Sequence, residues 1–190
     1  MIVIAPYNSK WPSEYADLSR EISIALGNLA MRIDHIGSTS IPGLGAKDII
    51  DIQVTVRELT PLPISLLQDV GFVYVKAHSS DHVPAGESPE PSQCAKQYFC
   101  SGPSRRQSHI HIRVHGKRNQ KYALLFRDYL RSNPNACKTI ELIKLQLAKH
   151  HAEDVETYYD IKDPVYDLIW EAAKLWANST LWSVNLPRDA

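Results

Sequence analysis

The sequence predicts an α/β fold in which an α/β half is followed by a helical half. Residues 49–56 and 108–114 alternate apolar and polar side chains, which is the period of a half-buried strand. Residues 11–29 instead repeat apolar side chains every three or four positions, as an amphipathic helix does. After Gly116 the helical spacing continues through most of the remaining chain. Strands are therefore expected in the first part of the chain and helices in the second.

The first elements are a helix, two strands and the loop between them. The helix is predicted over 11–29, and Pro12 suits its first turn because no intrahelical partner is needed there. A short strand is predicted over 31–36. Residues 37–47, GSTSIPGLGAK, carry three glycines and a proline, so we expect a loop. The clearest strand spans 49–56, with Ile50, Ile52, Val54 and Val56 on one face and Asp51, Gln53 and Thr55 on the other.

Shorter elements and a long loop come next. We predict a short helix over 64–70 and a strand over 72–75. Residues 77–96 contain three prolines and many polar residues, and are expected to form a long, mobile loop. Residues 97–100 are predicted to be an edge strand. The strand over 108–114 has Ile110, Ile112 and Val114 on one face and His109, His111 and Arg113 on the other.

The helical half is predicted to contain several helices separated by prolines. Asn133 and Pro134 end the first helix and start a second, which runs to about His150. A shorter helix is expected over 154–162. Asp163-Pro164 then caps a last helix, whose inner face is formed by Val165, Ile169, Ala172 and Trp176.

Composition gives no general argument for a charged polymer as partner. The 190 residues include 21 Lys plus Arg and 21 Asp plus Glu, so the formal net charge is zero. Neither nucleic acid nor an anionic membrane is therefore expected as a partner. The three cysteines lack CxxC spacing, which argues against a disulfide framework and a structural zinc site; they are Cys94, Cys100 and Cys137.

The chain is expected to be one soluble domain in the cytoplasm. The apolar N-terminal stretch before Pro6 is too short for a signal peptide, and no long apolar run follows. No repeat or linker divides the chain, so a single domain is predicted over 1–190. Its α/β half is expected at about 1–116 and its helical half at about 117–178.

The loop at Gly37 is the first candidate site. A glycine lets a ligand approach the backbone, and exposed amides with hydroxyl groups can cradle phosphate oxygens. The residues are Gly37, Ser38, Thr39 and Ser40. Lys47 adds a charged donor, and Asp51 on the next strand is placed to hold a magnesium ion that bridges phosphates. Composition alone favours the simpler interpretation, an ordinary turn followed by a solvent-facing aspartate.

The second candidate site is the histidine pair on the later strand. His109 and His111 share a face with Arg113, and alternate histidines can share a metal ion or bind an anion. Two solvent-exposed histidines are the simpler interpretation. A functional role for the pair is better supported if Asp51 lies on the same sheet face. Asp51, His109 and His111 then form a candidate catalytic and metal-binding set.

The third candidate site is a group of arginines. Arg127 and Arg131 lie four residues apart on one helical face and could clamp a phosphate or a carboxylate. Arg105 and Arg106 belong to the same basic group. An ion pair with Asp128 on a solvated face is an equally good interpretation.

Several of these segments resemble the GrpB family, which is placed in the nucleotidyltransferase superfamily. The resemblance extends over about 6–164, most of the chain, and its matching stretches keep the family's order. They are Pro6-Tyr7 with Trp11-Pro12, HIGSTSIPGLGAKDIIDI from His35 to Ile52, SHIHIRV, LFRDYLRSNP from Leu125 to Pro134, and then Lys144 and Lys162.

The resemblance implies a polymerase-β-like nucleotidyltransferase fold, a mixed sheet flanked by helices. It implies that Ser38 belongs to the Gly-Ser turn that binds triphosphate and that Asp51 is the first metal-binding carboxylate. The chain departs from that pattern at Gln53, where a second acid is usual, and at Asp48, where relatives usually carry proline. A third carboxylate is usual on a later strand, where this chain offers His109 and His111.

These departures bear on the metal. One carboxylate with two neutral imidazoles offers magnesium little negative charge. The site is therefore expected to use one metal ion, a different metal, or none. Mg or Mn is the expected cofactor if one is bound.

Three functions remain open. The leading hypothesis is a protein that binds a nucleoside triphosphate and transfers a nucleotidyl group to a small-molecule acceptor. The expected roles are phosphate binding by the Gly37 loop, metal binding by Asp51, metal binding or general base catalysis by the two histidines, and anion binding by Arg127 and Arg131.

The alternatives belong to other classes. A non-catalytic nucleotide- or phosphate-binding module is favoured by Gln53, and the resemblance adds relatives that are joined to dephospho-coenzyme A kinase. A metal-dependent hydrolase using Asp51, His109 and His111 is the third hypothesis. The sequence is silent on oligomeric state.

Overall fold

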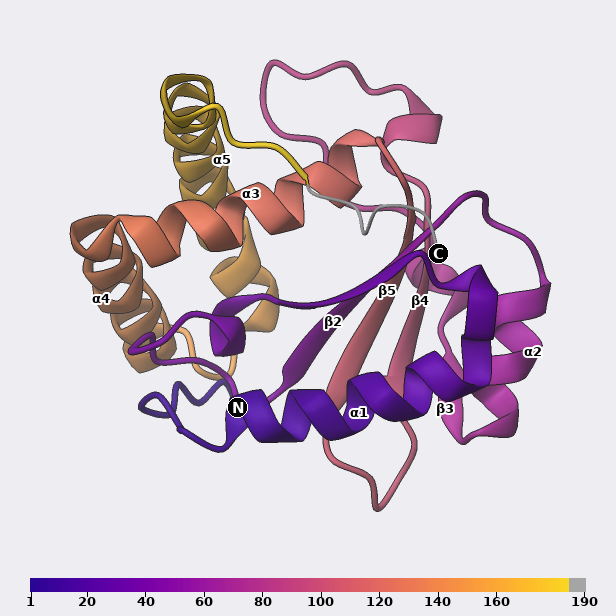
Figure 1. Ribbon diagram of the computed structural model, residues 1–190. Coiled ribbons are helices and arrows are strands. Elements are labelled where there is room, and N and C mark those ends of the chain that lie inside the picture. The colour runs from indigo at the N-terminus through magenta and orange to yellow at the C-terminus, as the bar shows by residue number, and fades with distance from the viewer. Residues whose placement is uncertain (185–190) are drawn as a thin grey trace.

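The protein is built around a five-stranded mixed sheet with the strand order β1-β2-β5-β4-β3 (Figure 1). The computed structural model describes residues 1–184. The strands are β1 (Arg32–Ile36), β2 (Ile50–Val56), β3 (Phe72–Tyr74), β4 (Lys96–Ser101) and β5 (Ser108–Val114). The central strands β2 and β5 run parallel, and every other pair is antiparallel. The predicted mixed sheet is therefore confirmed.

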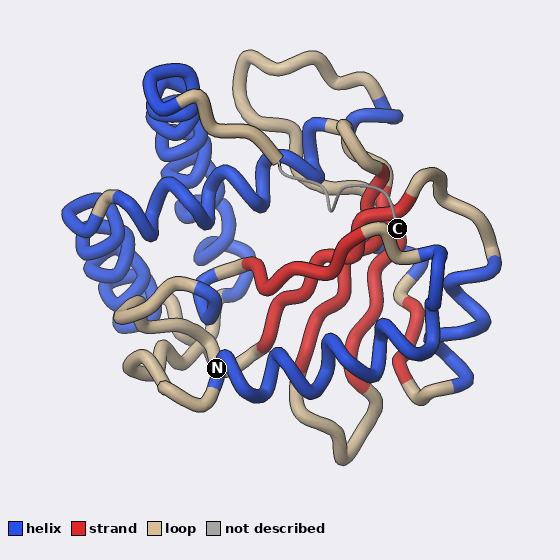
Figure 2. The backbone as a smooth tube through the Cα atoms, in the orientation of Figure 1, coloured by secondary structure: helices blue, strands red, loops and turns tan. Residues whose placement is uncertain are grey.

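Five α-helices flank this sheet within residues 1–184 (Figure 2). They are α1 (Trp11–Leu26), α2 (Leu62–Asp69), α3 (Arg118–Ser132), α4 (Pro134–His150) and α5 (Val155–Thr180). In the figures α1 lies across the sheet and α2 lies beside β3, whereas α3, α4 and α5 gather on the opposite side of the view. Within the described part of the chain, no helix combines the length and the apolar character that a membrane crossing requires.

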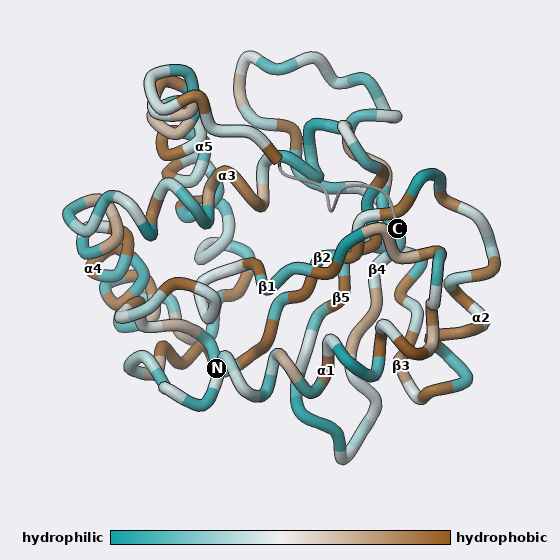
Figure 3. The backbone as a smooth tube through the Cα atoms, viewed as in Figure 1, coloured by the Kyte–Doolittle hydropathy of each residue, from teal (hydrophilic) through white to brown (hydrophobic). Residues whose placement is uncertain are grey.

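One face of the sheet is apolar and packs against α1 and α2. The alternation predicted for β2 and β5 places their apolar side chains here, and six of them are almost completely buried: Ile50, Ile52, Val54, Val56, Ile110 and Ile112. Val114, at the end of β5, is only partly buried. Helix α1 presents its own apolar stripe to them, and Figure 3 shows the brown and teal stretches alternating along it. The stripe consists of Trp11, Leu18, Ile22 and Leu26.

The opposite face of the sheet is polar and looks toward the helical half. Helix α3 packs on β1, β2 and β5 from this side. The loop after β1 reaches across as well, because Ile41 and Leu44 are buried in a cluster with Phe126 and Leu130 of α3 and Ile140 of α4. This anchoring fixes the position of the Gly37 turn relative to α3 and α4.

Two predictions about the elements were wrong. Strand β4 was expected at an edge, but it lies between β5 and β3, so both of its edges are paired. Two helices were expected on either side of Asp163-Pro164, but α5 runs through Pro164 without a break. An interior proline removes one hydrogen bond and crowds the carbonyl four residues earlier, at a cost of about 3 kcal/mol. The burial of Tyr158 before it and Trp170 after it offsets this cost and keeps the helix continuous.

Candidate functional site

The polar face of the sheet forms the floor of a large cavity with about 1630 Å³ of empty space, part of it open to solvent. Its walls come from the Gly37 turn and from α3, α4 and α5. Most residues that the sequence singled out line it: Gly37, Ser38, Thr39, Lys47, Asp51, His109 and His111. The turn and the two central strands therefore converge on one concave surface.

The Gly37 turn is closely fitted against Asp51. Gly37 has φ 67°, a left-handed conformation that favours glycine. A Cβ atom at this position would lie 2.3 Å from Asp51 Oδ2, which is closer than atoms can approach. The following residues Ser38–Ser40 form a single 3₁₀ turn. Any side chain at Gly37 would therefore displace the carboxylate or the turn.

Asp51 and His109 lie side by side on the two parallel strands. Their Cα atoms are register partners, and His109 Nδ1 is 3.3 Å from Asp51 Oδ1. Both side chains are about one-third exposed, His109 at 32% and Asp51 at 29%. Because Nδ1 faces the carboxylate, Nε2 is the nitrogen left to meet a ligand. The pair resembles a base with its orienting acid.

His111 has a different environment, although it shares the same face. Its Nδ1 is 3.3 Å from Arg113 Nη2. Burial, and then the charge of Arg113, lowers the pKa of His111 well below its usual value, so the ring is neutral.

The three-residue metal site expected from the sequence is not assembled by these side chains. In residues 1–184, no three His, Cys, Asp or Glu side chains are arranged to share an ion. A guanidinium also lies next to His111 Nδ1, and its charge opposes a second cation at that nitrogen.

The position expected for a second acid belongs to a buried network. Gln53 is fully buried, and its Oε1 accepts a hydrogen bond of 2.7 Å from Arg113 Nη1. Arg113 in turn pairs with Asp81 from the 77–96 loop, with Nε 2.7 Å from Oδ2. Burial raises the pKa of Asp81, but Arg113 and Lys96 together hold it well below its usual range. The amide of Gln53 thus serves Arg113 and not a ligand.

Lys144 is a cavity residue that the candidate set omitted. It projects from α4, is only 3% exposed, and donates to Ser38 Oγ at 2.9 Å and to Gly45 O at 2.6 Å. Burial, and then the nearby charge of Lys162, lowers the pKa of Lys144 to about 8. The signal was present in the sequence, because Lys144 interrupts the apolar stripe of α4 between Ile140 and Leu147.

Two further lysines and a group of tyrosines complete the wall. Lys162 Nζ lies 4.0 Å from the ring centre of Tyr166, and Lys47 Nζ lies 4.7 Å from that of Tyr159. The cavity is lined by five cationic side chains (Lys47, Lys96, Arg113, Lys144 and Lys162) and three carboxylates (Asp51, Asp81 and Asp163), a formal net charge of +2 with the lining histidines counted as neutral. Such a surface attracts anions.

Three predicted phosphate-binding residues lie outside the cavity lining. Arg127 is buried and bonds Asp128, Asp34 and the carbonyl of His35. Arg131 donates to Ser40 O at 2.6 and 3.0 Å. Ser40 Oγ donates to Gly37 O at 2.6 Å. These three side chains hold the turn in shape from behind.

The remaining basic residues and Asp48 join α1 to the sheet. Arg105 pairs with Glu21, and Arg106 pairs with Glu14. Asp48 accepts a hydrogen bond of 2.7 Å from Trp11 Nε1. None of these six residues lines the cavity.

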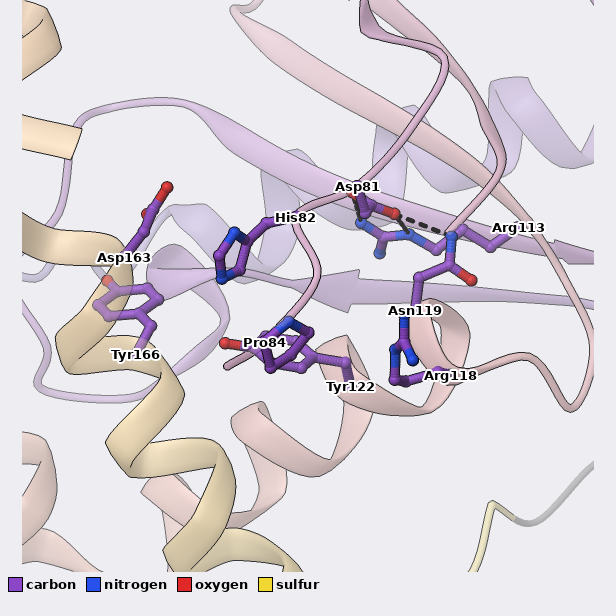
Figure 4. A pocket seen from close by; sticks show the side chains of 9 residues that line it. All are labelled: Asp81, His82, Pro84, Arg113, Arg118, Asn119, Tyr122, Asp163 and Tyr166. Atoms are coloured by element: carbon purple, nitrogen blue, oxygen red, sulfur yellow. Dashed lines mark hydrogen bonds and ion pairs between the residues drawn. The ribbon is translucent and has the colours of Figure 1, made fainter. Parts of the chain in front are cut away.

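A smaller cavity of about 550 Å³ adjoins the first beneath the 77–96 loop (Figure 4). Figure 4 shows Asp81 bonded to Arg113 and Asn119 at one side, with Tyr122, His82 and Tyr166 around the space. Five lining residues are shared with the large cavity: Asp81, Arg113, Tyr122, Asp163 and Tyr166. His82 Nε2 lies 3.0 Å from Asp167 on α5, so the loop is tied to the helical half.

Comparisons with known proteins give a consistent result. The family model described as "GrpB protein" matches residues 1–172. The UPF0157 protein YqkA of Bacillus subtilis is 32% identical over 99% of this chain and 53% of its own length. A dephospho-CoA kinase of Mycolicibacterium paratuberculosis is 30% identical over 94% of this chain and 47% of its own length. The chain thus spans about half the length of these curated relatives.

The same likeness is seen among solved structures. The crystal structure of the conserved protein GrpB from Enterococcus faecalis shares 30% sequence identity with this chain. It superposes with a TM-score of 0.74 and covers 92% of this chain and 99% of that one.

Proposed function

The chain belongs to the GrpB family, and on this premise we propose that it binds a nucleoside triphosphate in the large cavity and transfers a nucleotidyl group to a small acceptor. The observation that carries the proposal is the convergence of the Gly37 turn, the Asp51 carboxylate and three of the four lining lysines (Lys47, Lys144 and Lys162) on one cavity. A triphosphate needs hydroxyl or amide donors and concentrated positive charge, and this wall supplies both.

The phosphates would lie against the turn and the lysines. Ser38 and the turn amides donate to phosphate oxygens, while Lys144 already bonds Ser38 and neutralises charge next to it. Lys162 and Lys47 line the same cavity, and each ammonium group lies over a tyrosine ring.

Asp51 fits a single magnesium ion whose other ligands are phosphate oxygens and water, because magnesium is commonly held by one or two carboxylates and substrate phosphates. The ion would supply charge neutralisation at the phosphates. His109, oriented by Asp51 through Nδ1, would take the proton of the acceptor hydroxyl at Nε2.

A non-catalytic nucleotide-binding module is the second candidate function. Gln53 in place of an acid and its bond to Arg113 favour it, because that pair leaves no second carboxylate to hold a metal ion. A module of this kind would serve a partner enzyme, as the relative named as a dephospho-CoA kinase suggests. The metal-dependent hydrolase has less support, since Arg113 lies beside His111.

Titration calorimetry with ATP, GTP, CTP and UTP, each with and without magnesium, tests the proposal. At least one nucleotide should bind with magnesium-dependent affinity, and Asp51→Ala should abolish that dependence while Asp17→Ala, on exposed α1, should not. Pyrophosphate release in the presence of an acceptor would separate the enzyme from the module. Unchanged affinity and turnover in Asp51→Ala would remove its assigned role.

A further inference from the structure

Ser38 and Lys144 form a hydrogen-bonded pair in the wall of the cavity. Lys144 Nζ donates to Ser38 Oγ at 2.9 Å, and its second bond, 2.6 Å to Gly45 O, fixes the direction of the amine. Tyr166 lines the same cavity wall as Ser38. A half-buried serine is therefore hydrogen-bonded to an amine that can exchange a proton with it.

The surroundings of Lys144 favour loss of its proton. Lys162 of α5 and Lys47 of the loop oppose its charge, while Glu141 of α4 and Asp51 of β2 favour it. Burial is the largest influence, and the pKa falls to about 8. At pH 7 roughly one lysine in ten is then neutral, with a lone pair that can accept the Ser38 proton while an N–H still bonds Gly45 O.

We propose that Ser38 is a nucleophile activated by Lys144, and that the transfer proceeds through a covalent nucleotidyl ester on Ser38. The proposal rests on the proposed function, and extends it from phosphate binding to covalent catalysis. Serine–lysine pairs are a known form of activated nucleophile. The cationic wall suits an electrophilic phosphorus centre better than a neutral carbonyl, because it neutralises the phosphate oxygens that repel an attacking alkoxide.

The two half-reactions balance without a further reactant. In the first, Ser38 Oγ bonds to the α-phosphorus, the bond to the bridging oxygen breaks, and pyrophosphate leaves with the electron pair. The Ser38 proton passes to Lys144 Nζ. In the second, the acceptor hydroxyl gives its proton to His109 and bonds to phosphorus, while Ser38 Oγ leaves and recovers its proton from Lys144.

Intact-mass spectrometry of the protein with a nucleoside triphosphate and magnesium, without acceptor, tests the intermediate. The wild type should gain one nucleotidyl mass, which peptide mapping should place on Ser38. Ser38→Ala should gain none, whereas Ser65→Ala, on the exposed surface of α2, should behave as the wild type. Nucleotide binding without any adduct, or an adduct on another residue, would overturn the proposal.

Lys144→Arg separates proton acceptance from phosphate binding, because arginine keeps the charge and does not release its proton. The variant should retain nucleotide affinity within about tenfold, while adduct formation slows by about 100-fold or more. Wild-type labelling should accelerate as pH rises toward 8, and the variant should lack this rise. Lys138→Arg, exposed on the same helix, is the matched control. Labelling of Lys144→Arg at the wild-type rate would exclude Lys144 as the base.

A fluorophosphonate probe distinguishes this proposal from the nucleotide proposal. The probe needs only a reactive serine. If the protein binds no triphosphate but Ser38 is labelled in a Lys144-dependent way, the reactive pair is supported and the nucleotide proposal is contradicted. If the protein binds a triphosphate but Ser38 reacts with neither the probe nor the nucleotide, nucleotide binding is supported and the role of Ser38 as a nucleophile is contradicted. Thermal unfolding of each variant checks that it is folded.

Discussion

A Cβ atom at Gly37 would lie 2.3 Å from Oδ2 of Asp51, so the turn and the acid meet in direct contact. These residues are on successive elements of the chain, and the loop between them is anchored in the helical half by Ile41 and Leu44. The contact makes the backbone of the turn and the carboxylate two parts of one surface. Its geometry tolerates no side chain at Gly37.

Gly37→Ala should therefore damage both stability and nucleotide binding. The Gly37 backbone, with φ 67° and ψ −174°, lies in a region essentially restricted to glycine, so alanine is strained there by about 1–3 kcal/mol, and the collision with Asp51 adds to this. Gly43→Ala is the matched control, because Gly43 has φ 82° but open space around its Cβ position. Urea unfolding should show a larger loss for Gly37→Ala than for Gly43→Ala. Equal losses would mean that the contact with Asp51 adjusts freely.

His35 should make stability depend on pH in mildly acidic solution. Its ring stacks on Tyr15 at 4.6 Å, Nε2 lies 3.0 Å from Thr39 Oγ1, and burial lowers its pKa from 6.5 to about 4. Between pH 6.5 and about pH 4, His35 is protonated in the unfolded chain but not in the folded chain, so protonation favours unfolding. The contribution of His35 is complete above pH 6.5 and declines as pH falls toward 4, by at most about 1.4 kcal/mol per pH unit.

His35→Gln removes this titration, so its unfolding free energy should fall less steeply between pH 6.5 and 4.5 than that of the wild type. Urea unfolding across this range measures the slope. His150→Gln, at an exposed position of α4, should leave the slope unchanged. A wild-type slope in His35→Gln would show that His35 is not the group responsible.

Arg127 should matter for folding and not for ligand contact. It is 8% exposed and joins α3 to β1 through Asp34 and the carbonyl of His35. Arg127→Met leaves buried acceptors without a donor, and we expect a loss of about 3 kcal/mol, the lower end for a broken buried pair, because Arg32 still pairs with Asp34.

Nucleotide affinity of folded Arg127→Met should stay close to that of the wild type. Arg20→Ala, which breaks an exposed pair with Asp17, should change stability little. Chemical unfolding and calorimetry give the two quantities. A large loss of nucleotide affinity without a loss of stability would instead indicate that Arg127 contacts the nucleotide.

Lys162 should contribute to binding of the phosphate tail. Its ammonium lies over Tyr166 in the cavity wall. Lys162→Met should weaken triphosphate binding by about tenfold, since a charge-assisted hydrogen bond contributes roughly 1.5–3 kcal/mol. It should weaken monophosphate binding less, which calorimetry with ATP and AMP measures. Lys121→Met, exposed on α3, is the control; equal losses for both nucleotides would place Lys162 away from the tail.

Local sequence patterns predicted the sheet faces well. Strands β2 and β5 each have one side against α1 and α2 and the other toward the cavity, and this asymmetry produces strict alternation in the sequence. The break at Asn133-Pro134 was also readable. The break expected at Pro164 was not real, because packing on both sides of the proline offsets its cost to the helix.

Contacts between residues far apart in the chain could not be predicted from the sequence patterns. Ser38 and Lys144 are separated by 106 positions, so only the fold shows that they touch. Arg127 and Arg131 do lie on one helix, as predicted, but sequence spacing cannot say whether that helix face meets a ligand or the chain's own carbonyls. The sequence of the 77–96 loop likewise did not indicate that Asp81 forms ion pairs with Arg113 and Lys96.

A crystal structure of the protein with a non-hydrolysable nucleoside triphosphate and magnesium tests the central claim most directly. We predict density for the phosphates between the Gly37–Ser38 turn and the His109 strand, within hydrogen-bond distance of Ser38 and Lys144, with the metal on Asp51. A nucleotide bound elsewhere on the molecule, with this cavity empty, would contradict the account.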